Sequence, residues 1–233
     1  MTFIIKIKRC RGTESPAYRQ SFSYDGGGNT SVAAVLKELN RRRPLLDTDG
    51  SPAPPIDWEC GCFARKCGAC AMRINGRPQL ACSAFLSEMN DRTITLEPLG
   101  KFPVVSDLTV DRSCMFESLK QIRLWLEEDA CGGERTHEER YQAARCLMCG
   151  CCLEICPNFS PEGNFAGAAA AVAAFRILDQ TPYTEHWEEI AARYKKLYFE
   201  GCGKSLACHD ICPAGLPVEE LIVRSNAAAV WKK

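Results

Sequence analysis

The sequence lacks any apolar stretch long enough to cross a bilayer. The most apolar run, FAGAAAAVAAF at residues 165–175, is about half of the ~20 residues that a membrane-spanning helix requires, and it is mostly alanine. The first ten residues, MTFIIKIKRC, alternate apolar and basic side chains, which predicts a strand and not the long apolar core of a secretion signal. We therefore expect neither a membrane span nor a secretion signal.

Net charge and histidine are also scarce. Lysine plus arginine and aspartate plus glutamate both number 29, so no overall electric field favours nucleic acid as a partner. The three histidines, His137, His186 and His209, are scattered and form no histidine–carboxylate constellation. We therefore expect this chain to carry no catalytic residue and no substrate site of its own.

Cysteine, in contrast, is abundant, with 16 in 233 residues. Without a secretion signal a disulfide scaffold is not expected, because reducing compartments keep thiols free. Metal binding is then the favoured interpretation, and a zinc ribbon is the simplest alternative. Three separate spacings match iron–sulfur patterns, and two of them end in Cys-Pro, which favours clusters over zinc.

The first hundred residues predict a small mixed domain. Alternating runs at 2–9 and 18–24 indicate a hairpin, and an apolar stripe at 32–39 indicates a helix capped by Asn29 or Thr30. Asn75-Gly76 is a hairpin-turn signal, and RTITLEPL is typical of a closing strand.

This region contains a C-x₄-C-x₂-C…C pattern, the order used by plant-type 2Fe–2S ferredoxins. Its four cysteines are Cys62, Cys67, Cys70 and Cys82. Three sulfurs can wrap a cluster only on a tight loop of small residues, and Gly68 and Ala69 suit such a loop. The fourth ligand is expected to return from a neighbouring strand.

The second half carries two further runs, Cys146-x₂-Cys149-x₂-Cys152-x₃-Cys156-Pro157 and Cys202-x₅-Cys208-x₃-Cys212-Pro213. In bacterial ferredoxins the fourth cysteine of such a run ligates the other cluster. The crossover assigns a 4Fe–4S cluster to Cys146, Cys149, Cys152 and Cys212. It assigns the second cluster to Cys156, Cys202 and Cys208.

Ser205 stands where the second cluster's fourth cysteine would be. Three thiolates favour a 3Fe–4S cluster with an open corner, and the alternative is that Ser205 ligates a fourth iron. The remaining thiols have no partner spacing and are expected to be packed or unliganded: Cys10, Cys60, Cys114, Cys131 and Cys151.

Apolar stripes predict helices through the rest of the second half. One begins at Ser113, carries Met115 to Leu126 on one face and ends at Gly132-Gly133. Others are expected to open at Asn164, at Thr184 and near Pro217.

The three cluster patterns, with the segment LGKFPVVSDLTVD between them, closely resemble the iron–sulfur subunit of succinate dehydrogenases and fumarate reductases over nearly the whole chain. The resemblance implies an α+β chain, with a β-grasp 2Fe–2S domain at 1–102 and a helical ferredoxin-like domain at 103–233. It implies a flavoprotein partner with FAD, a membrane anchor subunit of cytochrome-b type, and a peripheral position on the cytoplasmic side of the cell membrane. The clusters would pass single electrons between FAD and quinone.

Departures from the family pattern favour a menaquinone-linked enzyme over a ubiquinone-linked one. NFSP follows the first Cys-Pro where ubiquinone-linked members often carry tryptophan, Gly203 replaces a common histidine, and Ala214 replaces a lysine. Phe63 and Arg65 alter the usual Cys-Arg-x-Gly of the 2Fe–2S loop. Carried over by position, the expected quinone contacts are Asn158, Phe159, Gly203 and Lys204.

Three rival interpretations are open. An electron-transfer subunit of another flavoprotein, such as a glycerol-3-phosphate dehydrogenase or heterodisulfide reductase relative, need not carry the 2Fe–2S domain. A thiol-dependent fumarate reductase subunit would need a further cysteine-rich domain, for which no room is expected before Lys233. A zinc-stabilised interaction module is the third.

Overall fold

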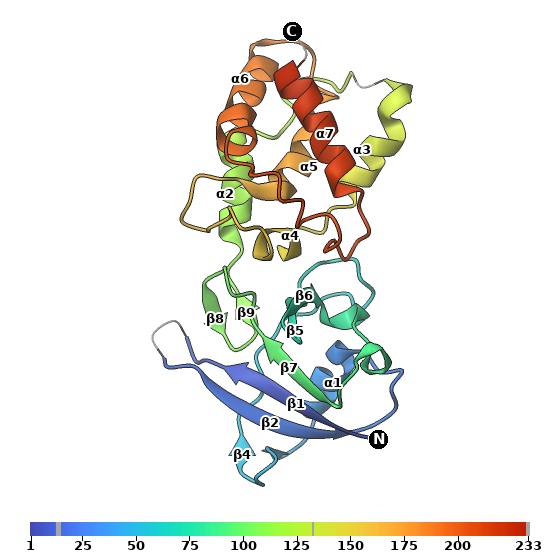
Figure 1. Ribbon diagram of the computed structural model, residues 1–233, viewed down its shortest axis with the longest axis vertical. Coiled ribbons are helices and arrows are strands. Elements are labelled where there is room, and N and C mark those ends of the chain that lie inside the picture. Colours follow the sequence, from blue (N-terminus) through green and yellow to red (C-terminus); the bar gives the residue numbers. More distant parts are fainter. Residues whose placement is uncertain (13–14, 132, 232–233) are drawn as a thin grey trace. The chain divides into compact units, whose positions relative to one another are not determined.

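The structure is a computed structural model that describes residues 1–12, 15–131 and 133–231, and the chain divides into two compact units (Figure 1). Met1–Asp111 is built on a sheet, and Arg112–Lys233 is helical. The expected α+β class, a sheet-based unit followed by a helical one, is confirmed. The boundary expected after residue 102 precedes a hairpin, β8 (Val104–Ser106) and β9 (Thr109–Val110), that belongs to the first unit.

The first unit has a β-grasp arrangement of one mixed sheet and one helix. Within the described residues, the sheet has the strand order β2-β1-β7-β5-β6, with β1 and β7 parallel and the other neighbours antiparallel. The sheet strands are β1 (Thr2–Arg9), β2 (Tyr18–Asp25), β5 (Ala71–Ile74), β6 (Arg77–Leu80) and β7 (Thr93–Glu97). A short pair, β3 (Leu45–Leu46) and β4 (Pro52–Ala53), follows α1 (Val32–Leu39).

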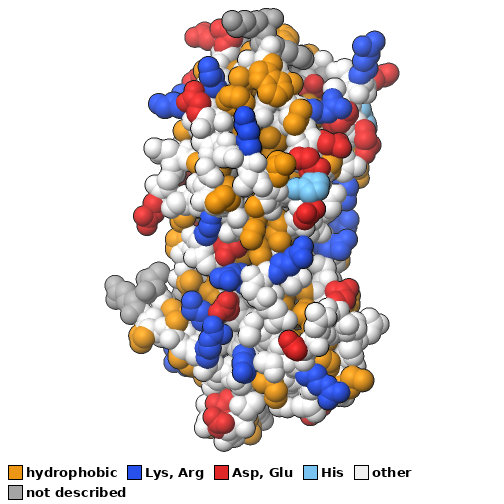
Figure 2. All heavy atoms as spheres, viewed as in Figure 1, with side chains coloured by type: hydrophobic (Ala, Val, Ile, Leu, Met, Phe, Trp, Pro, Cys, Tyr) orange, Lys and Arg blue, Asp and Glu red, His pale blue; other side chains and the backbone are white. Residues whose placement is uncertain are grey.

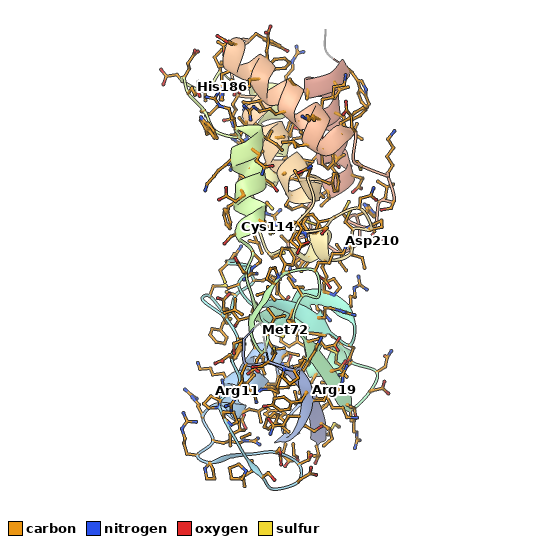
Figure 3. The ribbon with its side chains drawn as sticks, turned by 90° about the vertical axis from the view of Figure 1, so that its left-hand side faces the viewer. Arg11, Arg19, Met72, Cys114, His186 and Asp210 are labelled. Carbon is orange, nitrogen blue, oxygen red and sulfur yellow. The ribbon has the colours of Figure 1, made fainter. Side chains whose placement is uncertain are left out.

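Side-chain alternation and turn chemistry explain these elements. Phe3, Ile5 and Ile7 of β1 are buried, as period-2 alternation requires of a strand with one face on the core. Asn75 and Gly76 join β5 to β6 with φ of 50° and 79°, as expected for a two-residue hairpin turn. In Figure 3, Met72 of β5 lies in the interior of this unit.

The cap of α1 differs from the expectation. Ser31, and neither Asn29 nor Thr30, is the N-cap, and its Oγ accepts the backbone N–H of Ala34 at 3.3 Å. Ser31 also forms a bridge with Phe85, so pairing with a distant segment decides where the helix begins.

The second unit is organised around α5 (Gly167–Leu178), which packs against α2, α3, α4, α6 and α7 (Figure 1). The helices around it are α2 (Ser113–Ile122), α3 (His137–Ala144), α4 (Cys151–Glu154), α6 (Glu185–Tyr194) and α7 (Val218–Asn226). Half of the residues of α5 are alanine, and most of the helix is buried, because small side chains let its neighbours approach closely. It begins at Gly167, later than the expected Asn164.

Helix α2 is shorter than its apolar stripe predicts. It ends at Ile122, because Arg123 adopts a left-handed conformation with φ of 64° and its side chain pairs with Glu127 and Glu189. Leu126 is therefore not helical and is partly exposed. Of the expected stop at Gly132-Gly133, Gly132 lies outside the described residues.

The surface is mixed in charge. Positive and negative side chains are interspersed over the face shown in Figure 2, in keeping with a net charge of zero. In the ranges 1–12, 15–131 and 133–231, no helix combines the length and apolarity that a membrane span needs.

A buried ion pair ties β1 to the β8–β9 hairpin. Arg9 is 1% exposed and its Nη2 lies 2.9 Å from Oδ2 of Asp107, whose side chain is 2% exposed. The guanidinium also donates to the carbonyls of Pro54 and Pro55, and Asp107 accepts the backbone N–H groups of Cys10 and Asp57. Removing one member would leave the other charge buried and uncompensated.

We predict that Arg9→Met lowers the free energy of unfolding of the first unit by about 3–5 kcal/mol. Its control is Arg19→Met, which breaks the 2.7 Å pair of the 59% exposed Arg19 with Glu97 and should cost less than about 1 kcal/mol. Native-state hydrogen exchange at the β1 amides measures both values on the same strand. Equal losses in the two variants would contradict the role given to the Arg9–Asp107 pair.

Candidate iron–sulfur centres

Three thiols of the first group, Cys62, Cys67 and Cys70, lie on the loop between β4 and β5. The backbone N–H groups of Ala64 and Lys66 donate to Sγ of Cys62 at 3.3 and 3.2 Å. These donors favour the thiolate and lower the pKa of Cys62 from its ordinary 9.0 to about 7. A sulfur already surrounded by N–H groups fits a cluster ligand, since the same donors reach the sulfurs of a bound cluster.

The loop bends through left-handed residues. Phe63, Arg65 and Gly68 have φ of 51°, 56° and 73°. Arg65 thus keeps the conformation that glycine favours, at a cost of roughly 1–2 kcal/mol. The ring of Phe63 contacts Trp58 of the same loop edge-on, with centroids 6.0 Å apart, and the ammonium of Lys37 in α1 lies 5.0 Å from its centroid.

The other thiols of this group converge from the adjacent strands. Cys70 precedes β5, and Cys82 lies in the 3₁₀ turn Ala81–Ser83 after β6, so the fourth thiol does return from a neighbouring strand. Both are buried, and burial raises the pKa of the Cys70 thiol. Cys60, which has no matching spacing in the sequence, lies near enough to Cys67, Cys70 and Cys82 for these thiols to influence its pKa. The structure therefore offers five thiols to one centre.

Replacing Cys62 with alanine should remove the 2Fe–2S centre, whereas Cys60→Ala should leave it in place. Cys62 is supplied with backbone donors by its own loop, and the pKa of Cys60 is raised by burial instead. Iron analysis should show a loss of about two irons per chain in Cys62→Ala only. The 2Fe–2S EPR signal of the reduced protein gives an independent readout, and its loss in Cys60→Ala alone would exchange the roles of the two cysteines.

The second thiol group lines one apolar cavity of the helical unit. Cys146 follows α3, Cys149 precedes α4, Cys152 lies in α4, and Cys212 comes from the segment before α7. The structure brings together all four thiols that the crossover assigned to one cluster. Burial raises the pKa of Cys146 and, well above 9.0, the pKa of Cys152. The neighbouring thiols raise both pKa values further. Such a set fits a positively charged iron cluster, which allows all four to ionise together.

Cys149 is the exception in this group. The thiol of Cys151 donates to it, and this hydrogen bond lowers the pKa of Cys149 to about 7. Cys151 is fully buried in the first turn of α4, two residues after Cys149. The backbone of Cys149 is held as well, because Nη1 of Arg112 donates to its carbonyl at 3.3 Å.

The third thiol group lines a cavity of ≈ 460 Å³. Cys156, Cys202 and Cys208 share its wall with Ser205, as the crossover predicted. Burial raises the pKa of the Cys208 thiol. Ser205 lies between two left-handed residues, Lys204 and Leu206, and its Oγ accepts the N–H of Ala207 at 3.5 Å.

A tyrosine also reaches this group. Tyr198 lies in the π-helical turn Lys195–Phe199, and its hydroxyl donates to Sγ of Cys202 at 3.6 Å. Burial raises the pKa of Tyr198, so the hydroxyl keeps its proton. Sequence reasoning missed this contact, although the spacing of four residues along a helical segment was a signal for it.

Three of the four expected quinone contacts line the same cavity. Asn158, Gly203 and Lys204 are on its wall, but Phe159 is not. Phe159 is 5% exposed, and its ring lies 3.5 Å from where a Cβ on Gly167 would be. Phe159 is thus placed in the core of the helical unit.

Asn158 and Gly203 depend on each other. The Asn158 amide donates to the carbonyl of Gly201 at 2.9 Å, and a Cβ on residue 203 would lie 3.0 Å from Oδ1 of Asn158. A side chain at 203 would therefore displace the amide.

The histidines stay apart. His186 is buried against the carbonyl of Trp125, and His209 pairs with Glu219, which raises the pKa of the imidazole. Figure 3 places His186 and Cys114 at different ends of the helical unit, with Asp210 on the loop beside His209.

A zinc site was one of the alternatives for the thiols. In the part of the chain that the structure describes, no three His, Cys, Asp or Glu side chains are arranged to hold a single metal ion. Zinc requires its ligands within about 2.0–2.3 Å of one point.

Two family models match separate parts of the chain. Residues 4–117 match the 2Fe-2S iron-sulfur cluster binding domain, and residues 142–216 match the 4Fe-4S dicluster domain. A solved chain of the Mycobacterium smegmatis Sdh1 complex has a similar fold, with a TM-score of 0.76 and 22% identity, over 99% of this chain and 97% of that one.

Curated relatives extend over most of the sequence. The succinate dehydrogenase iron-sulfur subunit of Bacillus subtilis is 34% identical over 230 residues, covering 94% of this chain and 89% of that protein. The fumarate reductase iron-sulfur subunit of Wolinella succinogenes is 34% identical, covering 72% and 75%. The succinate dehydrogenase iron-sulfur subunit of Coxiella burnetii is 27% identical, covering 88% and 86%. The chain therefore belongs to the family of iron–sulfur subunits of succinate dehydrogenases and fumarate reductases.

Proposed function

We propose that this chain carries single electrons between the FAD of a flavoprotein subunit and a quinone at a membrane anchor subunit. The observation that carries the proposal is the third thiol group, which opens into a cavity of ≈ 460 Å³ in contact with both polar and apolar side chains. The names of the relatives from Bacillus subtilis and Wolinella succinogenes support a complex that interconverts succinate and fumarate.

The proposed route for the electrons consists of three iron–sulfur centres. Iron–sulfur clusters supply one-electron chemistry, which connects a two-electron flavin to a two-electron quinone. The proposed ligands are Cys62, Cys67, Cys70 and Cys82 for 2Fe–2S, Cys146, Cys149, Cys152 and Cys212 for 4Fe–4S, and Cys156, Cys202 and Cys208 for 3Fe–4S. The chain holds the thiolates in place and supplies hydrogen bonds to them.

Ser205 supports the 3Fe–4S assignment. Its hydroxyl lines the cavity with the three thiols, where a fourth ligand would be needed. A hydroxyl is far less acidic than a thiol, and its oxygen is a harder ligand than sulfide-bound iron prefers. The corner next to Ser205 is therefore proposed to stay open.

Ser205→Cys should convert the third centre into a second 4Fe–4S cluster. The added thiolate completes the ligand set, so iron analysis should rise by about one iron per chain and the EPR signal of the oxidised 3Fe–4S cluster should disappear. Ser205→Ala is the matched control and should keep the signal. An oxidised wild-type complex without this signal would refute the assignment.

The cavity is also the proposed quinone site. Asn158 uses one N–H of its side-chain amide on the carbonyl of Gly201, and the second N–H can donate to a quinone carbonyl. Phe199, Ile222 and Val223 provide apolar wall. Lys204 adds a positive charge at the rim, with its ammonium 6.0 Å from the Phe199 ring. A quinone ring needs both a polar contact and an apolar slot.

Menaquinone is the proposed quinone, and ubiquinone is the alternative. The support is Gly203, which stands where ubiquinone-linked relatives often have histidine. The space next to Gly203 is occupied by the side chain of Asn158. The proposed partners are a flavoprotein with FAD and an anchor of cytochrome-b type, with this chain peripheral on the cytoplasmic side of the membrane.

Asn158→Leu should raise the KM for quinone about tenfold, because a hydrogen bond to the quinone carbonyl worth ~1.4 kcal/mol is lost. Succinate oxidation with an artificial dye and the 3Fe–4S EPR signal should stay at wild-type levels, which separates quinone binding from damage to the cluster. Asn164→Leu, at an exposed position on the same connection, is the control. Unchanged quinone kinetics in Asn158→Leu would remove this residue from the site.

A further inference from the structure

Tyr198 is a buried hydroxyl with a single hydrogen-bond partner. Its side chain is 1% exposed, and its O–H donates to Sγ of Cys202 at 3.6 Å. A buried tyrosine hydroxyl almost always finds a partner, and here that partner is a thiol of the third group.

The surroundings hold the ring of Tyr198 in one place. Phe165 stacks on it with ring centroids 5.5 Å apart, and Tyr194 packs on it at 5.1 Å. A Cβ on Gly201 would lie 2.7 Å from the Phe165 ring, so the glycine lets this stack approach the chain just before Cys202. The π-helical turn Lys195–Phe199 directs the hydroxyl to the thiol, and such turns occur often at functional sites.

We infer that Tyr198 is a positioning residue. The hydrogen bond that its hydroxyl donates to Cys202 raises the reduction potential of the cluster bound by Cys156, Cys202 and Cys208. This inference rests on the proposed function, because it takes those three thiols as the 3Fe–4S ligands. When the cluster gains one electron from its neighbour, the negative charge on its thiolates grows. A hydrogen bond to one thiolate is then stronger in the reduced state, and no bond to hydrogen breaks.

The direction of the effect fits the place of this centre. A higher potential favours the arrival of an electron from the 4Fe–4S centre of the same unit, next to the proposed quinone cavity. Hydrogen bonds to sulfur are one of the general means by which a protein sets cluster potentials.

Tyr194→Phe provides a matched control. It removes the same hydroxyl from the adjacent ring, but the Tyr194 O–H donates to Oδ1 of Asn226 at 2.7 Å and not to a thiol. Both variants therefore lose one tyrosine hydroxyl and its hydrogen bond, but only Tyr198→Phe loses a hydrogen bond to Cys202.

The experiment is an EPR redox titration of the 3Fe–4S signal in the assembled complex. At the wild-type midpoint, Tyr198→Phe should lower the ratio of reduced to oxidised cluster by about three- to tenfold, a shift of about 30 to 59 mV to lower potential. Tyr194→Phe should leave the midpoint unchanged. Equal shifts in both variants, or none in either, would overturn the inference.

The possible failures can be told apart. A wild-type complex with no 3Fe–4S signal refutes the proposed function itself, whereas a signal with an unaltered midpoint in Tyr198→Phe refutes only the role of Tyr198. If Tyr198→Phe does not assemble, the Tyr194→Phe complex prepared with ring-deuterated tyrosine replaces it. Pulsed EPR should then show deuterium coupled to the oxidised cluster, and its absence overturns the inference.

Discussion

The convergence of thiols in apolar surroundings is the constraint on which the helical unit depends. Cys146, Cys149 and Cys152 meet Cys212 around one cavity, and burial opposes ionisation of the thiols of Cys146 and Cys152. Only a positively charged group between them makes four thiolates compatible with that environment. The segments that carry the thiols are therefore stabilised as much by the proposed clusters as by their own packing.

Small residues give these segments room. A Cβ on Gly167 would lie 2.2 Å from Cδ2 of Leu153, and its φ of 74° is one that glycine favours. Leu153 belongs to α4, so the first residue of the central helix directly contacts the cluster-bearing turn. The alanines that follow bring the other helices close to the same axis.

Each crossover set that the sequence spacing assigned in the helical unit lines one cavity, although its thiols come from two distant runs of the chain. Their role as cluster ligands stays a prediction. What spacing could not predict depends on tertiary burial. Cys60 lies on the same loop as Cys62 and near Cys70 without a matching spacing. Phe159 is buried in the core, and Ser31 is the cap because of its pairing with Phe85. The end of α2 likewise follows from the left-handed Arg123 and its two carboxylate partners.

Each centre has hydrogen-bond donors that are not ligands, and these donors differ in kind. Cys62 accepts two backbone N–H groups, Cys149 accepts a thiol, and Cys202 accepts the hydroxyl of Tyr198. Cluster type and hydrogen bonds to sulfur together determine the potential of such a centre. Ligand spacing, which is what the sequence displays, sets only the cluster type. The order of the reduction potentials of the three centres therefore also depends on residues that ligand spacing cannot show. Tyr198, which lies in a π-helical turn four residues before Cys202, is one such residue.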